Sequence, residues 1–189
     1  MSSRITIGKL NTMKAEGEKF VMMTAYDATF SRLISDAGAE TILVGDSLGM
    51  VLQGHDTTIP VTISDMAYHT SCVCRGRPHS LVVADMPFMS YDTTDKALES
   101  GMMLMQAGAQ MVKLEGGVWL SETIHQLVER GIPVCAHLGL TPQSVNVFGG
   151  YKVQGRTPKE AKSILADAVE IQDAGASLLV LECIPAHLA

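Results

Sequence analysis

The sequence is poor in charged residues, and its basic residues do not cluster. Asp, Glu, Lys and Arg make up 18% of the 189 residues, and the net charge is −6. Without a basic patch, the chain is not expected to bind nucleic acid or an anionic membrane. It also lacks an apolar run near the roughly 20 residues that span a bilayer, and residues 1–10 contain no apolar core of signal-peptide length. We therefore expect a soluble, cytoplasmic protein.

Cysteine is also sparse, and its spacing does not indicate a disulfide or a zinc site. Cys72 and Cys74 are two positions apart, so on a helix they would point to different sides. Cys135 and Cys183 lie in short apolar runs typical of strands. We interpret all four as buried, reduced thiols rather than as metal ligands.

Two glycine-rich patterns for phosphate binding are absent as well. No Gly-x-Gly-x-x-Gly follows the first apolar run, and no Gly-x-x-x-x-Gly-Lys-Ser/Thr occurs anywhere in the chain. This argues against a nucleotide-binding sheet of the Rossmann type, although that fold also alternates strands with helices.

The sequence does contain a repeated alternation of short apolar runs and helical stretches. Hydrophobic residues make up 47% of the chain, enough for one sizeable core. The runs are apolar at nearly every position, which is typical of strands covered on both faces, as in parallel sheets. The predicted strands are residues 21–27, 41–46, 81–85, 111–115, 134–137 and 178–182. The predicted helices are residues 29–37, 63–75, 94–107, 119–130 and 158–174.

A repeated Ala-Gly-Ala marks the ends of three of these helices. Gly38, Gly108 and Gly175 each precede a predicted strand, where glycine suits a helix end with positive φ. Repeated strand–helix units predict an α/β fold, which we take to be a (β/α)₈ TIM barrel. Such a barrel has eight units and typically about 250 residues. With about six units present, we expect residues 1–189 to form a single barrel domain that lacks its C-terminal units.

Ionisable residues stand at or beside the C-terminal end of every predicted strand. They are Asp27, Asp46, Asp85, Glu115, His137 and Glu182. Taken singly, each is compatible with an ordinary polar strand end. In a parallel barrel, however, these ends share the face on which active sites form. We therefore expect these side chains to converge at one mouth of the barrel.

Converging carboxylates repel one another unless a cation lies between them, and oxygen ligands favour Mg²⁺ or a similar hard cation. Asp46 and Asp85 are the best candidate ligands, because each directly follows an apolar run and precedes a tight segment. Glu115 is a candidate outer partner. Lys113 is two residues before Glu115 and therefore on the same face of its strand. We interpret Lys113 as a counter-charge or carboxylate anchor, with a Schiff-base nucleophile as the alternative.

Long stretches of the chain resemble one enzyme family. Residues 44–61, with Gly-Asp-Ser-Leu-Gly-Met and Gly-His-Asp-Thr-Thr, are similar to a signature segment of the ketopantoate hydroxymethyltransferases. So are residues 137–156, with His-Leu-Gly-Leu-Thr-Pro-Gln-Ser and Phe-Gly-Gly-Tyr. Shorter matches follow in the expected order at residues 24–27, 84–89, 112–117 and 181–185. The resemblance extends from about Ile7 over essentially the whole chain.

The resemblance implies a transferase (EC 2.1.2.11) of pantothenate biosynthesis. Its reaction moves a hydroxymethyl group from 5,10-methylenetetrahydrofolate to 3-methyl-2-oxobutanoate, giving 2-dehydropantoate through a magnesium-stabilised enolate. Members assemble into large homo-oligomers, typically decamers. They also continue for roughly two more βα units, and this chain departs from them in that respect.

The resemblance also implies roles for individual residues. Asp46 and Asp85 would hold Mg²⁺ and thereby bind the 2-oxo acid, with Glu115 nearby. The other expected substrate contacts are Ser47, Lys113 and His137. Glu182 would be the general base, and because it emerges from an apolar run we expect burial to raise its pKa.

Two other functions remain open at this point. One is a related metal-dependent barrel enzyme of the phosphoenolpyruvate mutase and isocitrate lyase type, which would share the enolate but not the folate. The other is an inactive truncated subunit, which would fold within an oligomer and turn nothing over.

Overall fold

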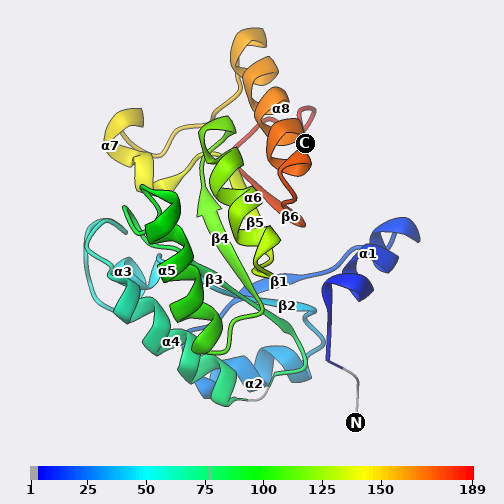
Figure 1. Ribbon diagram of the computed structural model, residues 1–189, viewed down its shortest axis with the longest axis vertical. Helices are drawn as coiled ribbons and strands as arrows, with labels where there is room; N and C mark the ends of the chain where they lie inside the picture. The colour runs from blue at the N-terminus through cyan, green and yellow to red at the C-terminus, as the bar shows by residue number, and fades with distance from the viewer. Residues whose placement is uncertain (1–3, 77) are drawn as a thin grey trace.

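The computed structural model of the protein describes residues 4–76 and 78–189. Six strands form one parallel sheet, and their order in the sheet follows their order in the chain. The strands are β1 (Met22–Thr24), β2 (Thr41–Val44), β3 (Leu81–Asp85), β4 (Met111–Glu115), β5 (Val134–Gly139) and β6 (Leu178–Glu182). The sheet curls into an open arc, so the predicted α/β class with six parallel strands is confirmed (Figure 1).

Helices that follow β1 to β5 cover the convex face of the arc, whereas α1 precedes β1 and lies apart from them (Figure 1). The longer helices are α1 (Ile7–Ala15), α2 (Ala28–Asp36), α4 (Ile63–Arg75), α5 (Thr94–Gln106), α6 (Ser121–Glu129) and α8 (Pro158–Asp173). The loops add the short helices α3 (Leu48–Val51) and α7 (Val145–Phe148), and the 3₁₀ turns η1 (Val118–Leu120) and η2 (Pro142–Ser144). These short elements lie after strand ends, where they build the rim of the arc.

Polar caps decide where two of the long helices begin. Thr62 and Asp65 form a capping box at α4, and Thr157 and Glu160 form one at α8. In each box, two backbone N–H groups that would otherwise lack a partner are satisfied by side chains.

Asp27 also caps a helix, and this overturns one expectation from the sequence. Its carboxylate accepts hydrogen bonds from the backbone N–H groups of Thr29 and Phe30 at the start of α2, and its side chain is exposed. An aspartate at this position accepts hydrogen bonds from two N–H groups of the first helical turn that would otherwise lack a partner. The expectation that Asp27 joins the other strand-end carboxylates is therefore wrong.

The two faces of the sheet carry different side chains because successive residues of a strand point to opposite sides. On the convex face, residues such as Val82, Val112 and Ala136 pack against the helices in the main core. The concave face of β3 to β5 is lined near its N-terminal end by Leu81, Val83, Met111 and Cys135, which pack against Leu10 and Met13 of α1. The next residues along this face are Asp85, Lys113, Glu115 and His137. On the concave face of β3 to β5, the ionisable groups therefore lie at the C-terminal rim.

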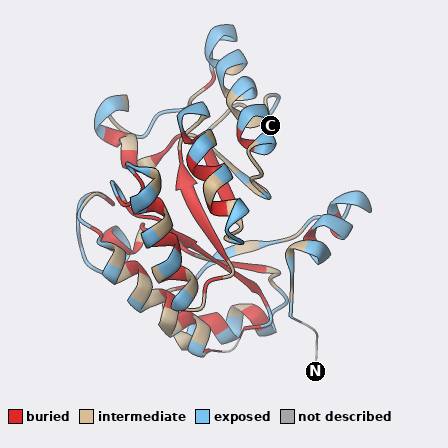
Figure 2. Cartoon of the chain, viewed as in Figure 1, coloured by how far each residue is buried: buried red, intermediate tan, exposed pale blue. Residues whose placement is uncertain are grey.

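The central strands are buried more completely than the edge strands. Every residue of β3 and β4 is buried, whereas no residue of β1 or β6 is fully buried (Figure 2). Within the described residues, β1 pairs only with β2 and β6 only with β5. Apolar side chains such as Met23 and Leu179 are consequently exposed at the two edges.

Two smaller predictions have different outcomes. Gly38, Gly108 and Gly175 have φ values of +97°, +111° and +106°, so the expected helix ends are confirmed. All four cysteines, which lie within the described ranges, are free thiols, as expected. The expectation that all four are buried is wrong: only Cys135 is buried, Cys72 and Cys74 on α4 are half-buried, and Cys183, which follows the edge strand β6, is exposed. Within residues 4–76 and 78–189, no helix is long and apolar enough to cross a membrane.

Candidate active site

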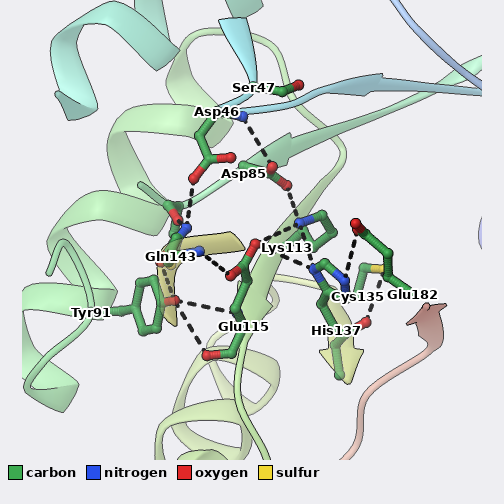
Figure 3. A network of polar contacts seen from close by, with 12 residues as sticks. Asp46, Ser47, Asp85, Tyr91, Lys113, Glu115, Cys135, His137, Gln143 and Glu182 are labelled. Atoms are coloured by element: carbon green, nitrogen blue, oxygen red, sulfur yellow. Dashed lines mark hydrogen bonds and ion pairs between the residues drawn. The ribbon is translucent and has the colours of Figure 1, made fainter. Parts of the chain in front are cut away.

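Five ionisable side chains meet at the C-terminal rim of the arc (Figure 3). They come from four successive strands or the residues that follow them, and each is at most 5% exposed: Asp46 after β2, Asp85 on β3, Lys113 and Glu115 on β4, and His137 on β5. Glu182 at the end of β6 lies beside His137, but 41% of its side chain is exposed. The strand ends named from the sequence are thus brought together, except for Asp27.

Lys113 lies at the centre of the cluster. Its Nζ is 2.8 Å from Asp85 Oδ1, 3.8 Å from Glu115 Oε1 and 3.3 Å from His137 Nδ1. Burial by itself would lower the pKa of Lys113, but the nearby carboxylates of Asp85 and Glu115 outweigh it and raise the pKa above its usual range. Lys113 is therefore an ammonium ion. A Schiff base requires a neutral amine, so this geometry favours the counter-charge over the nucleophile.

Asp46 and Asp85 lie side by side. The backbone N–H of Asp46 donates to Asp85 Oδ2 at 3.0 Å, so the two carboxylates belong to one site rather than to opposite ends of the molecule. Burial, followed by repulsion from Asp85, raises the pKa of Asp46 to about 7. Burial also raises the pKa of Asp85, although Lys113 opposes the shift. Both shifts have the same main cause: burial penalises the charged form of each aspartate, so the pocket favours a cation beside them when both are ionised.

The donor set at this position fits a hard cation. Among the described residues, Lys113 Nζ, at 2.8 Å, is the one polar group that pairs with Asp85 Oδ1. In the described part of the chain, no group of three or more His, Cys, Asp or Glu side chains is arranged to hold a metal ion. Magnesium usually takes only one or two protein carboxylates and completes its shell with water and substrate. A two-carboxylate site therefore suits it better than a zinc-like cage.

His137 links the buried cluster to Glu182. Its Nδ1 is 3.3 Å from Glu115 Oε1, and its Nε2 is 3.3 Å from Glu182 Oε2. Burial lowers the pKa of His137, but the contacts with Glu115 and Glu182 outweigh it and leave the pKa raised. The two carboxylates thus favour the protonated imidazole, while the Lys113 ammonium, 3.3 Å from Nδ1, opposes it.

The pKa of Glu182 is shifted in the direction opposite to that expected from the sequence. The contact with His137 lowers it, and burial opposes this only in part because the side chain is half-exposed on an edge strand. The expectation that apolar neighbours raise the pKa of Glu182 is therefore wrong for this structure. The neighbours of Glu182 along the chain are apolar, but the group that faces its carboxylate is an imidazole.

Sequence reasoning assigned no role to three further residues at the rim. The hydroxyl of Tyr26 lies 2.8 Å from Ser47 Oγ, next to Asp46. Tyr91, from the loop after β3, and Gln143, in η2, lie against Asp46 and Glu115 (Figure 3). Gln143 belongs to the Thr-Pro-Gln-Ser motif, which could have directed attention to it. Nothing in the sequence pattern distinguishes Tyr91 from an ordinary loop aromatic.

A cavity of about 330 Å³ opens beside Glu115 at the same rim. The loops after β4 and β5 and the N-terminal half of α8 surround it, and its lining includes Trp119, Phe148 and Asp167. Trp119 is the one tryptophan of the chain, is 62% exposed and stacks on Tyr91 at a centroid distance of 6.3 Å. The rim therefore offers an aromatic recess next to the charged cluster.

Comparisons with solved structures support the barrel fold. A 2,3-dimethylmalate lyase of the PEP mutase/isocitrate lyase superfamily superposes with a TM-score of 0.67 at 17% identity, over 95% of this chain and 62% of that chain. A phosphonopyruvate hydrolase crystallised with oxalate and Mg²⁺ superposes with a TM-score of 0.71 at 12% identity, over 93% of this chain and 62% of that chain. At such identities the likeness shows the fold alone.

Comparisons of sequence are more specific. The family profile described as ketopantoate hydroxymethyltransferase matches residues 4–189. A 3-methyl-2-oxobutanoate hydroxymethyltransferase of Colwellia psychrerythraea is 62% identical over 186 residues, which are 98% of this chain and 70% of the relative. The protein of that name from Pseudomonas putida is 58% identical over 185 residues, again 70% of its length. The chain thus spans about 70% of the length of these relatives. On this evidence, the chain belongs to the ketopantoate hydroxymethyltransferase family.

Proposed function

We propose that the rim cluster is the 2-oxo acid half of a hydroxymethyltransferase active site. Family membership makes the activity that of a 3-methyl-2-oxobutanoate hydroxymethyltransferase of pantothenate biosynthesis, EC 2.1.2.11, and implies a folate co-substrate. The observation that carries the proposal is the burial of Asp46, Asp85, Glu115, Lys113 and His137 in one cluster. Such a set of groups suits the removal of a proton next to a ketone.

Asp46 and Asp85 are the residues that would hold Mg²⁺, with Glu115 as an outer partner. The adjacent, buried carboxylates of Asp46 and Asp85, which offer only oxygen donors, support this assignment. The ion, when bound, would supply positive charge that stabilises the enolate by several kcal/mol.

Lys113 and Ser47 would receive the carboxylate and keto group of the substrate. Lys113 is a buried ammonium held between Asp85 and Glu115, so it is fixed in position before substrate arrives. Ser47 offers a hydroxyl that a hydrogen bond with the Tyr26 hydroxyl orients. His137, within reach of Lys113 and Glu115, would flank the same substrate.

Glu182 would be the general base that takes a proton from C3 of 3-methyl-2-oxobutanoate. A positioned carboxylate base contributes about 10²–10⁴-fold to such a step. His137 keeps Glu182 ionised by lowering its pKa, so the base is in its active form at neutral pH. This makes Glu182 a weaker base than a buried carboxylate, but one that is permanently available.

The co-substrate is proposed to be 5,10-methylenetetrahydrofolate, from which the enolate receives its one-carbon unit. The cavity beside Glu115, with its aromatic lining, is a recess next to the cluster that could receive part of it. Assembly into a homo-oligomer, typically a decamer, is a further proposal that rests on the family resemblance. A cytoplasmic location is a proposal that rests on the sequence.

Deuterium exchange at C3 of 3-methyl-2-oxobutanoate tests the proposed chemistry without requiring folate. We expect the 189-residue chain to catalyse this exchange in D₂O when Mg²⁺ is present, and to lose it when the metal is chelated. Proton NMR of the substrate measures the rate. Absence of exchange in a folded chain would favour the inactive subunit, whereas turnover without folate would favour a lyase-type enzyme.

A further inference from the structure

The Thr-Pro-Gln-Ser motif contains a buried residue to which the proposed chemistry assigns no task. Gln143 lies in η2, directly after β5, and is 6% exposed. Its side-chain Nε2 donates to Asp46 Oδ2 at 2.8 Å and to the Met86 carbonyl at 2.9 Å. Its backbone N–H donates to Glu115 Oε2 at 3.0 Å. One residue thus binds two of the three carboxylates of the cluster.

The amide of Gln143 can have only one orientation. Asp46 and the Met86 carbonyl both accept hydrogen bonds, so the NH₂ group must face them. Its Oε1 then faces the Tyr91 hydroxyl, which donates to it at 2.5 Å. Burial raises the pKa of Tyr91 above its usual range, so the hydroxyl keeps its proton. A flipped amide would set oxygen against oxygen at two contacts and leave buried groups unpaired.

The charge of this residue matters as much as its shape. Lys113 already supplies a positive charge to Asp85, and a second cation beside Asp46 would compete with the metal. A neutral amide holds Asp46 Oδ2 without neutralising it, and leaves Asp46 Oδ1 without a hydrogen bond from Gln143. The contact therefore restricts the rotation of the carboxylate while preserving its charge.

We propose that Gln143 is a positioning residue that sets the carboxylates of Asp46 and Glu115 relative to each other, with Tyr91 fixing its amide. The side chain orients Asp46, and the backbone N–H orients Glu115. The inference rests on the proposed function, in which these carboxylates bind the metal and the 2-oxo acid. It gives the Thr-Pro-Gln-Ser motif a task, because η2 carries this residue into the cluster.

The test replaces Gln143 with Met, which keeps the length of the side chain and removes both polar atoms. The matched control is Gln110→Met, because Gln110 accepts a hydrogen bond from the backbone N–H of Val82 at the opposite end of the sheet. Binding of Mn²⁺ together with 3-methyl-2-oxobutanoate is measured by electron paramagnetic resonance, and thermal unfolding is measured in parallel.

We expect Gln143→Met to weaken Mn²⁺ binding by about 10–100-fold, the usual effect of losing an outer partner of a metal ligand. Gln110→Met should leave the Mn²⁺ affinity within about twofold of that of the unsubstituted chain, even if it lowers the unfolding temperature as much as Gln143→Met does. Tyr91→Phe should weaken binding in the same direction but less, because the NH₂ contacts remain. Equal binding in the two methionine variants would overturn the inference.

A crystal structure of Gln143→Met separates this inference from the proposed function. If the unsubstituted chain binds no Mn²⁺ with the keto acid, the magnesium proposal fails, and the structure still decides the role of Gln143. Rotation of the Asp46 carboxylate away from its place beside Asp85 would support positioning. An unmoved Asp46 carboxylate would contradict it, whatever the metal does.

Discussion

The centre and the edge of the curled sheet handle charge differently. Asp85, Lys113 and His137 stand on β3 to β5, are almost fully buried, and have pKa values set by burial together with one another. Glu182 occupies the equivalent place on β6 but is half-exposed, and a single imidazole dominates its pKa. The same pattern, an ionisable residue at the end of an apolar strand, therefore gives opposite pKa shifts for Asp85 and Glu182.

This difference separates two tasks. Central groups hold charge in a fixed geometry, which suits the binding of substrate and metal. The edge group remains accessible and ionised, which suits the transfer of a proton. Position in the sheet, rather than neighbours along the chain, determines which task a strand-end residue can perform.

The largest expected effect is on the exchange rate, when Glu182 on the edge strand β6 is replaced. Glu182→Gln should reduce C3 deuterium exchange by about 10²–10⁴-fold, because the amide cannot accept the proton. Binding of Mg²⁺ and 3-methyl-2-oxobutanoate should persist, since the central groups are intact. NMR measures the exchange and calorimetry measures the binding. Glu129→Gln, at the exposed end of α6, is the control. Exchange at the normal rate would remove Glu182 as the base.

The next largest expected effect is on stability, when Lys113 on the central strand β4 is replaced. Lys113→Met should lower the free energy of unfolding by about 3–5 kcal/mol, because it leaves buried carboxylates without their cation. The exposed pair Lys96–Asp92, at 3.2 Å, offers the contrast, and Lys96→Met should change stability by less than about 1 kcal/mol. Urea unfolding at neutral pH measures both. Equal losses in the two variants would erase the distinction between buried and exposed charge.

A third prediction concerns the proposed ligands. Asp46→Ala and Asp85→Ala should each weaken Mg²⁺-dependent binding of 3-methyl-2-oxobutanoate by at least about 10–100-fold, the range known for outer partners of metal ligands. Asp173→Ala, at the exposed end of α8, should leave binding unchanged. Calorimetry with and without Mg²⁺ gives the affinities. Unaltered affinity in both cluster variants would refute the metal role.

The smallest effect is a shift in a pH profile. The lowered pKa of Glu182 means that exchange should persist as pH falls below the usual glutamate range, and disappear only as pH passes through the lowered value. His137→Leu removes the contact that lowers this pKa, so the acid limb should move to higher pH. Exchange rates measured across the acidic range test this. An unmoved limb would mean that His137 does not control the ionisation of Glu182.

Much of the fold could be predicted because it depends on local patterns. The apolar runs became β1 to β6, and the glycines at helix ends have the expected positive φ values. Alternation along a strand also predicted that Lys113 and Glu115 share a face, and both reach the rim cluster. These features depend on the two-residue period of a strand and on the freedom of glycine, which neighbouring residues alone determine.

Other features depended on contacts between distant parts of the chain. Asp27 looked like another strand-end carboxylate, but the start of α2 uses it as a cap. Tyr91 and Gln143 showed no sign of belonging to one network, because they are far apart in sequence and meet only through the loops after β3 and β5. Their roles follow from which loops the sheet brings together at one rim.

The sequence by itself determined the strands, the five helices between them, the parallel arrangement and the set of chemical groups at the strand ends, since period and residue type are local properties. Only the tertiary structure decided how each group ionises. A pKa depends on the charges within a few ångströms and on the water that burial removes, and both are set by neighbours from other strands. For that reason Asp46 has a raised pKa beside Asp85, while Glu182 has a lowered pKa beside His137.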